Sequence, residues 1–164
     1  MKKLYGMDRY VKILKVSWQS SFVLTIAIAL LSLMLAFILK DSDSISQHTL
    51  IFCTSVCMLI IAFLLIFSDR WSRNRMKKLQ KEELLTKLVK YKSIYVKQMI
   101  CFVLMSLVCL ITILITKKIE VLLFDVFAIL MIIAKRPNGL KVKMDLNLSK
   151  EELSKFNHIK FGHK

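Results

Sequence analysis

Four apolar runs alternate with polar segments along this 164-residue chain. They cover residues 22–39, 49–68, 98–116 and 119–134. A helix rises 1.5 Å per residue, so the first three runs match a hydrocarbon core of about 30 Å. Each of the three predicts a membrane-spanning helix. The fourth run is shorter, near 24 Å as a helix, and it contains an acid.

The fourth run decides the predicted topology. Only Lys117 and Lys118 separate it from the third run, a tight turn without Gly, Pro or Asn. If 119–134 did not span, the tail 135–164 with its eight basic residues would lie opposite the basic connector 69–97. Basic loops stay in the cytoplasm by the positive-inside rule. The pattern therefore predicts four spans in the plasma membrane, with both termini cytoplasmic.

The fold expected from this pattern is an all-α membrane protein of four transmembrane helices, paired as two helical hairpins. Its transmembrane domain covers 19–134 and its cytoplasmic tail covers 135–164. Residues 1–18 carry an apolar stripe at 3- and 4-residue steps, which predicts an amphipathic helix lying in the interface and running into span 1. The stripe comprises Leu4, Met7, Val11, Leu14 and Trp18. The apolar run that follows is too long for a signal peptide and lacks an A-x-A-like site, so we expect the segment to be retained.

The tail changes character after a turn at 136–139, where Pro and Gly end the helical run. Apolar and polar residues then alternate with period 2, which predicts a strand. Its apolar members are Leu140, Val142, Met144, Leu146 and Leu148. A lone strand is not stable, so it should pair with another copy or a partner protein, or lie on the membrane; we favour pairing. Ser149 and Glu152 form a capping box that predicts a short helix over 150–157.

Composition agrees with a membrane protein: 56% of residues are apolar and the mean hydropathy is +0.58. The net charge of +15 follows from the topology, because lysines hold the cytoplasmic face, so nucleic acid is not an expected partner. The connector holds ten Lys or Arg against three acids and is the expected partner or anionic-lipid surface. The residues assigned to that surface are Arg70, Arg73, Arg75, Lys77, Lys78 and Lys81.

Small and hydroxyl side chains follow one face of span 1. In lipid, helices associate through close approach at small residues and through hydroxyl hydrogen bonds, so this stripe predicts the packing face. A hydroxyl-lined solute path is the alternative interpretation. The stripe includes Ser21, Thr25, Ala29, Ser32 and Ala36. Span 3 carries a similar face, with Ser106, Cys109, Thr112 and Thr116.

Asp125 is the one ionisable residue well inside a predicted span. An acid there should face the bundle interior and is a functional hypothesis. Its expected partners are Thr112, Thr116 and Ser32, or a lysine reaching inward from Lys117 or Lys118. Two interpretations stay open: a proton or cation site or gate, and a hydrogen-bonded acid that pins span 4 to its neighbours.

Enzyme motifs are absent from the sequence. The glycines do not form a phosphate loop, no nucleophile motif occurs, and the three His lie outside the apolar runs. The four cysteines all fall inside the runs, without His or carboxylates nearby in sequence, and are expected to pack. We therefore expect no enzymatic activity, no cofactor and no metal site.

The sequence thus predicts an oligomeric membrane anchor or sensor subunit that recruits a cytoplasmic protein, of the kind found in stress or phage-defence systems. Its expected partners are membrane lipids, copies of itself and that cytoplasmic protein. The alternative is a small oligomeric ion channel or ion-coupled transporter that uses Asp125. No span is broken by Gly or Pro, which counts against a transporter built on discontinuous helices.

Overall fold

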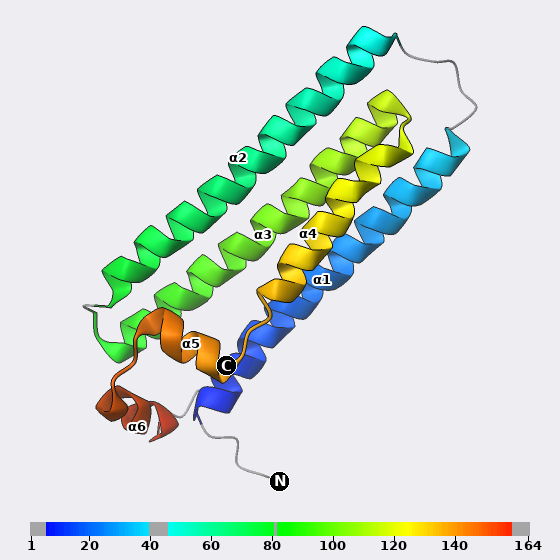
Figure 1. Cartoon of the computed structure of the whole chain (residues 1–164). Coiled ribbons are helices and arrows are strands. Elements are labelled where there is room, and N and C mark those ends of the chain that lie inside the picture. Colours follow the sequence, from blue (N-terminus) through cyan, green and yellow to red (C-terminus); the bar gives the residue numbers. More distant parts are fainter. Residues whose placement is uncertain (1–5, 40–45, 81, 159–164) are drawn as a thin grey trace.

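The computed structural model describes residues 6–39, 46–80 and 82–158, and over these residues it is helical without a strand (Figure 1). Four helices run side by side, and two short helices lie together at one end. The elements are α1 (Gly6–Ile38), α2 (Gln47–Leu79), α3 (Leu84–Thr116), the 3-10 turn η1 (Ile119–Val121), α4 (Leu122–Ala134), α5 (Gly139–Leu146) and α6 (Lys150–His158). Residues 1–5, 40–45, 81 and 159–164 lie outside the described residues, and with them Leu4 of the predicted apolar stripe and Lys81 of the predicted partner surface.

Three of the helices are long and apolar enough to cross a membrane: α1 from Tyr10 onward, α2 and α3. Large apolar side chains remain exposed along the bundle, among them Phe37 at 61%, Phe52 at 68% and Leu123 at 72%. Water would not tolerate a continuous surface of this kind, whereas lipid would. The chain therefore has the character of a multi-pass membrane protein.

α3 is the central helix of the bundle. It packs against α1, α2 and α4, and α4 packs in addition against α1. In the most apolar 18-residue stretch of α3, 50% of the residues are buried, compared with 11% in that of α2. α2 is therefore the peripheral helix. The small residues of α3 allow this close approach, because Ser106 and Cys109 are both fully buried.

Short turns connect α2 to α3 and α3 to η1. α2 ends at Leu79 and α3 begins at Leu84, so the basic connector is two helix ends joined by a short turn. After α3 the chain reverses at Lys117, which adopts the left-handed conformation (φ 55°) and donates its backbone N–H to the carbonyl of Ile113 at 2.7 Å. This αL cap makes the tight turn without glycine, at a conformational penalty of about 1 kcal/mol.

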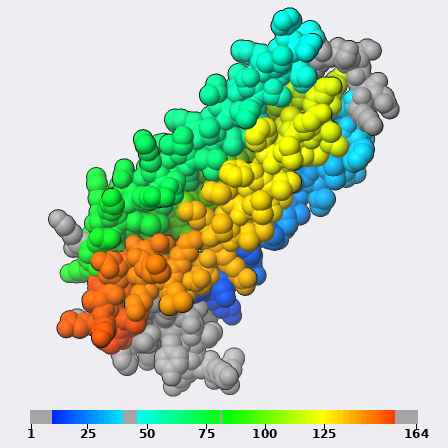
Figure 2. All heavy atoms as spheres, viewed as in Figure 1, coloured from blue at the N-terminus to red at the C-terminus, as the bar shows by residue number. Residues whose placement is uncertain are grey.

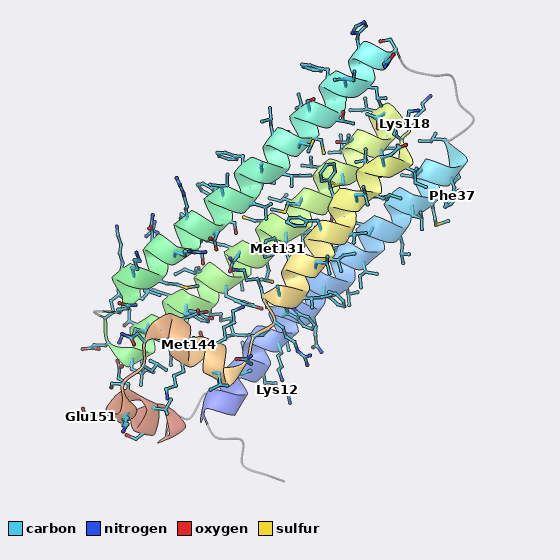
Figure 3. The ribbon with its side chains drawn as sticks, viewed as in Figure 1. Lys12, Phe37, Lys118, Met131, Met144 and Glu151 are labelled. Carbon is cyan, nitrogen blue, oxygen red and sulfur yellow. The ribbon has the colours of Figure 1, made fainter. Side chains whose placement is uncertain are left out.

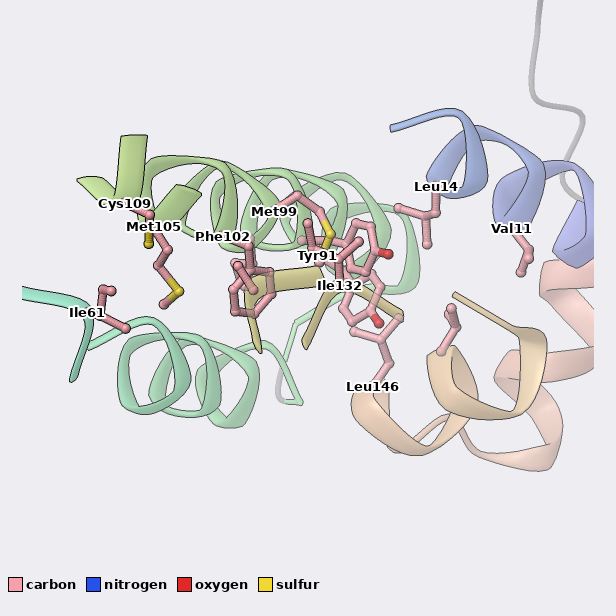
Figure 4. Packing of buried hydrophobic residues seen from close by; sticks show 14 of the residues in the cluster. Val11, Leu14, Ile61, Tyr91, Met99, Phe102, Met105, Cys109, Ile132 and Leu146 are labelled. Atoms are coloured by element: carbon pink, nitrogen blue, oxygen red, sulfur yellow. The ribbon is translucent and has the colours of Figure 1, made fainter. Parts of the chain in front are cut away.

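The N-terminal segment runs into span 1 as predicted. From Gly6 onward it is the beginning of α1, which continues without interruption to Ile38. The described part of its predicted apolar stripe is used for packing, because Val11 and Leu14 are buried. These side chains face the short helices at the end of the bundle (Figure 4).

The predicted strand over 140–148 is wrong: residues Gly139–Leu146 form α5. Asn138 begins the helix by accepting the backbone N–H of Lys141 on its side-chain oxygen at 2.6 Å. Asn147 ends it in the left-handed conformation (φ 48°), and the N–H of Leu148 reaches back to the carbonyl of Lys143 at 3.2 Å. The alternating apolar positions therefore divide between two faces.

Those two faces have different surroundings. Val142 and Leu146, four residues apart, are completely buried, whereas Leu140 and Met144 are 74% and 78% exposed. Leu148 follows the helix and is also buried. The apolar residues predicted to pair with another chain thus pack partly within this one.

The capping box prediction for α6 is confirmed. The backbone N–H of Glu152 donates to Ser149 Oγ at 3.1 Å, and the backbone N–H of Ser149 donates to Glu152 Oε2 at 3.0 Å. α6 follows immediately, and it packs against α1.

We call α5 and α6 together the cap. The cap closes the end of the bundle that also carries Lys12, whereas Lys118 and Phe37 lie at the opposite end (Figure 3). Leu14 of α1, Tyr91 of α3, Ile132 of α4 and Leu146 of α5 share one buried cluster (Figure 4). The cap is therefore an integral part of the bundle core.

A matched pair of substitutions tests the helical assignment of α5. Val142→Asp should lower the free energy of unfolding by about 3 kcal/mol, because it places a carboxylate in the core. Met144→Asp should change it by no more than about 0.5 kcal/mol, because this side chain is exposed. Thermal melting of the purified protein measures both. In a strand, residues 142 and 144 share one face, so equal effects would contradict the helix.

Candidate functional site

Buried polar side chains gather inside the apolar part of the bundle. Asp125 of α4 is 1% exposed, while Ser32 of α1 and Ser106 of α3 are completely buried. Asp125 lies about 10 Å along its helix from Lys118 and about 15 Å from Lys135, which is near the middle of the apolar segment. This is the depth at which a charge is most unfavourable in a bilayer.

The hydroxyls of Ser106 and Ser32 face the carboxyl group of Asp125 from two different helices. Neither closes a hydrogen bond with it, and both carboxyl oxygens of Asp125 are buried without a hydrogen-bond partner. The hydroxyls of Ser32 and Ser106 also lack partners. Three helices thus bring an acid and two hydroxyls together, each with unused hydrogen-bonding capacity. We call these three residues the acid site.

A carboxylate cannot remain charged and unpartnered at this depth, because its desolvation is worth several kcal/mol. It must be neutralised by a proton or by a cation. A protonated Asp125 has one O–H to donate, and a serine hydroxyl is a suitable acceptor. A cation would find carboxylate and hydroxyl oxygens, which are hard ligands. Both occupants fit the donor set.

The structure places the other predicted partners of Asp125 differently. The hydroxyl of Thr112 donates to the carbonyl of Val108 at 2.8 Å, and that of Thr116 donates to the carbonyl of Thr112 at 2.8 Å. Both are buried, but their hydroxyls are used within α3. Ser32 was among the expected partners, whereas Ser106 had been assigned only to the packing face of span 3.

The small-residue stripe of span 1 lies mostly inside the bundle. Thr25, Ser32 and Ala36 are buried, and Ser21 and Ala29 are half-buried. The hydroxyl of Thr25 is buried without a partner, like that of Ser32 seven residues further on. A second set of close contacts joins α2 to α3, where the thiols of Cys57 and Cys109 face each other. Among the described residues, no three His, Cys, Asp or Glu side chains lie close enough to hold a metal ion.

Side chains of α3 hold the cap through polar contacts. Lys87 Nζ pairs with Glu152 Oε1 of α6 at 2.5 Å, and the Lys87 side chain is only 5% exposed. Tyr91 donates its hydroxyl to Asp145 of α5 at 2.8 Å, and Tyr95 donates to the carbonyl of Lys135 at 3.0 Å. The cap is thereby attached to the same helix that supplies Ser106.

The other helices make contacts at the same end. Tyr10 of α1 donates its hydroxyl to the carbonyl of Leu88 at 2.6 Å. Trp18 donates its indole N–H to the carbonyl of Ile132 at 2.8 Å, near the end of α4. These contacts were not predicted from the sequence.

The predicted partner surface lies along the last turns of α2. Arg70, Arg75, Lys77 and Lys78 are exposed. Arg73 is exposed as well and pairs with Asp69 at 2.7 Å. The described part of this surface is accessible and strongly basic. It lies at the same end of the molecule as the cap (Figure 1).

The Lys87–Glu152 pair makes cap docking sensitive to acid. Hydrogen bonds from Lys87 Nζ and from the Ser149 backbone hold the pKa of Glu152 below its ordinary value of 4.5. Because the folded-state pKa is the lower one, the stabilisation is complete above pH 4.5 and is lost as the pH falls through the folded-state value. The protection factors of amides 150–154, which are corrected for the intrinsic pH dependence of exchange, should therefore fall in acid.

Glu152→Gln should weaken cap docking by about 1.5–3 kcal/mol at neutral pH and remove this acid dependence, because the charge-assisted hydrogen bond is lost. Glu151→Gln is the matched control, since Glu151 is exposed on the same helix. It should leave exchange at neutral pH unchanged. If both variants behaved alike, the Lys87 contact would not hold the cap.

Comparison with known proteins gives no relative: no family model, no curated protein and no solved structure matches this chain. The arguments for function therefore rest on the acid site and on the cap.

Proposed function

We propose that this chain is a four-span protein of the plasma membrane, with both termini in the cytoplasm, that binds a proton or monovalent cation at Asp125 as a membrane sensor subunit. Its cap and the basic surface of α2 would engage a cytoplasmic protein, and copies of the chain would associate in the membrane. The burial of Asp125 between two hydroxyls, with neither oxygen hydrogen-bonded, carries the proposal.

The contacts of α4 support a fourth span. With η1 it runs beside α1 and α3 and returns to the level at which the apolar run of α2 ends. At that level Lys135, directly after α4, lies 3.7 Å from Asp69, the first charged residue after the apolar run of α2. A helix of about 24 Å that is flanked by lysines crosses a bilayer with modest thinning or with snorkelling of those lysines.

Two helices join the acid site to the cap, α4 through the chain and α3 through side-chain contacts. α4 carries Asp125 and leads through Pro137 into α5, and α3 carries Ser106 and, further back, Lys87 and Tyr91. A change in the packing of α3 against α4 therefore reaches the residues that hold α5 and α6. Binding or release of an ion at Asp125 would in this way alter how the cap packs at the cytoplasmic surface. This is the physical basis for a sensor.

An ion carrier is the second candidate. The observation that favours it is the buried, unpartnered hydroxyl of Thr25, about 10 Å nearer the cap than Ser32 on the same helix face. It extends the set of unused polar groups towards the cytoplasmic end. A channel between chains is less well supported, because Asp125 is enclosed within the helices of one chain.

The Asp125 proposal predicts an occupant-dependent stability. The melting temperature of the wild-type protein in detergent should depend on pH or on the monovalent cation, and Asp125→Asn should remove that part of the dependence, because an amide needs no counter-charge. Thr112→Ala is the control, since the Thr112 hydroxyl is used within α3. Identical pH and cation profiles for the wild type and Asp125→Asn would contradict the proposal.

In liposomes the same substitution separates the two candidates. A sensor predicts no ion flux in either protein. A carrier predicts a flux in the wild type that Asp125→Asn abolishes.

Single cysteines in a cysteine-free background test the topology. Ser46 and Glu120 are exposed near one end of the bundle, and Asn74 and Ser149 are exposed near the other. Four spans predict that Ser46→Cys and Glu120→Cys are labelled from outside by a membrane-impermeant maleimide, and Asn74→Cys and Ser149→Cys only after lysis. Labelling of Ser149→Cys from outside would exclude the fourth span.

A further inference from the structure

A small polar pocket of about 150 Å³ lies where α2, α3 and the end of α4 meet α5. Three cations and two acids line it, together with Tyr91 and Tyr95 of α3. The charged members are Arg73, Lys135, Lys141, Asp69 and Asp145, and Gln98 lies beside them. None of these residues belongs to the acid site described above.

The pocket lies at the depth of lipid headgroups. Asp69 directly follows the apolar run of α2, Gln98 begins that of α3, and Lys135 directly follows α4. The two tryptophans of the chain lie near the same boundary and have cations over their rings: Arg136 is 5.6 Å from Trp18, and Lys97 is 5.6 Å from Trp71. Tryptophan flanked by basic residues is typical of the membrane–water interface.

The charges in the pocket do not balance. Three cations against two acids give the lining a net charge of +1. Asp69 is paired with Arg73 at 2.7 Å and approaches Lys135 at 3.7 Å, and Asp145 accepts the hydroxyl of Tyr91 at 2.8 Å. Lys141 donates to the carbonyl of Ala134 at 3.2 Å, and this contact supplies no counter-charge. The volume of the pocket and the net charge of its lining therefore suit one monoanion.

The surroundings of Lys141 favour that anion. Burial lowers the pKa of its ammonium group, the neighbouring Lys135 lowers it further, and Asp145 opposes both effects. An anion between the two lysines would remove their repulsion and replace lost solvation with charge-assisted hydrogen bonds. A phosphodiester carries the required single charge and several acceptor oxygens.

The neighbouring surface is suited to acyl chains. Along their apolar runs, the helices next to the pocket expose large side chains: α2 exposes Ile66 and Phe67 and α4 exposes Leu130 and Ile133, each at 47% or more. α2, α4 and α5 adjoin on the face shown in Figure 2, and residues in or next to these helices line the pocket, so the apolar surfaces of α2 and α4 continue from it along the bundle. A water-soluble phosphate would make no use of these surfaces.

We propose that this pocket binds the phosphodiester of an anionic glycerophospholipid, with Lys135 and Lys141 on the phosphate and the acyl chains along α2 and α4. The two acids limit the site to a headgroup with one negative charge. Phosphatidylglycerol meets this requirement, whereas phosphatidylcholine, with its added ammonium, leaves the lining charge uncompensated. The bound lipid would join the cap to the membrane-spanning helices.

Native mass spectrometry of the full chain, with phosphatidylglycerol or phosphatidylcholine added to the detergent, tests the proposal. We expect one phosphatidylglycerol per chain, retained in preference to phosphatidylcholine. Lys141→Gln should weaken its binding by about tenfold, through loss of a charge-assisted hydrogen bond. Lys143→Gln is the matched control, because Lys143 is exposed on the same helix, and it should leave binding unchanged.

A second variant keeps the test informative if Lys141→Gln disturbs the fold. Asp145→Asn removes one acid from the lining while an amide oxygen can still accept from Tyr91, so phosphatidylglycerol should bind more tightly. Asp125→Asn should leave lipid binding unchanged, which separates this proposal from that of the acid site.

Three results would overturn the lipid proposal. Equal retention of phosphatidylcholine would exclude recognition by charge. Equal loss in Lys141→Gln and Lys143→Gln would mean that the pocket is not the site. Competition by glycerophosphoglycerol, the deacylated phosphodiester headgroup, as strong as that by the lipid would identify a soluble phosphodiester as the ligand instead.

Discussion

Everything else in this molecule depends on the packing of α3. It is the one helix that contacts α1, α2 and α4, and its buried face changes along its length from serine and cysteine to methionine, tyrosine and lysine. In lipid, apolar area does not drive helices together, so small residues and hydroxyl groups must do so. Outside lipid the same helix can use aromatic and charged side chains. One helix therefore organises both the membrane-embedded bundle and the cap.

Within the bundle, α3 brings Ser106 to an acid that cannot be left charged. Asp125 and Ser32 complete a site in which hydrogen-bonding capacity remains unused on all three side chains. A purely structural acid would be expected to use its oxygens to fix neighbouring helices. The unused capacity at this depth is the reason for proposing an exchangeable occupant at Asp125. The cap end differs, since Lys87, Tyr91 and Glu152 there have partners.

Run length and periodicity predicted the long helices because burial in lipid constrains every residue of a span. Local chemistry predicted α6, since both halves of the Ser149–Glu152 capping box lie within four residues. α5 was predicted wrongly because alternating apolar residues also contain i, i+4 pairs, and only packing against neighbouring helices, among them α1 and α2, selects the helical pair Val142 and Leu146. The signals for the helix were Asn138 and Asn147, which cap it at either end.

The partners of Asp125 were only partly predictable. Ser32 was found because it shares the depth of the acid, but the choice of Ser106 over Thr112 depends on the turn between α3 and α4. Lys117 makes that turn in a left-handed conformation (φ 55°), a local geometry that the sequence does not specify. The sequence predicts the position of a residue along the bundle axis to within about one helical turn of 5.4 Å. This precision is too low to predict which side chains are in contact.

The most direct test of the central claim is the infrared stretching band of the Asp125 carboxyl group, identified by its loss in Asp125→Asn. If Ser106 and Ser32 face this group, Ser106→Ala and Ser32→Ala should each shift the band, and Thr112→Ala should leave it in place. A band that moves with Thr112→Ala but not with the two serine variants would contradict the acid site described here.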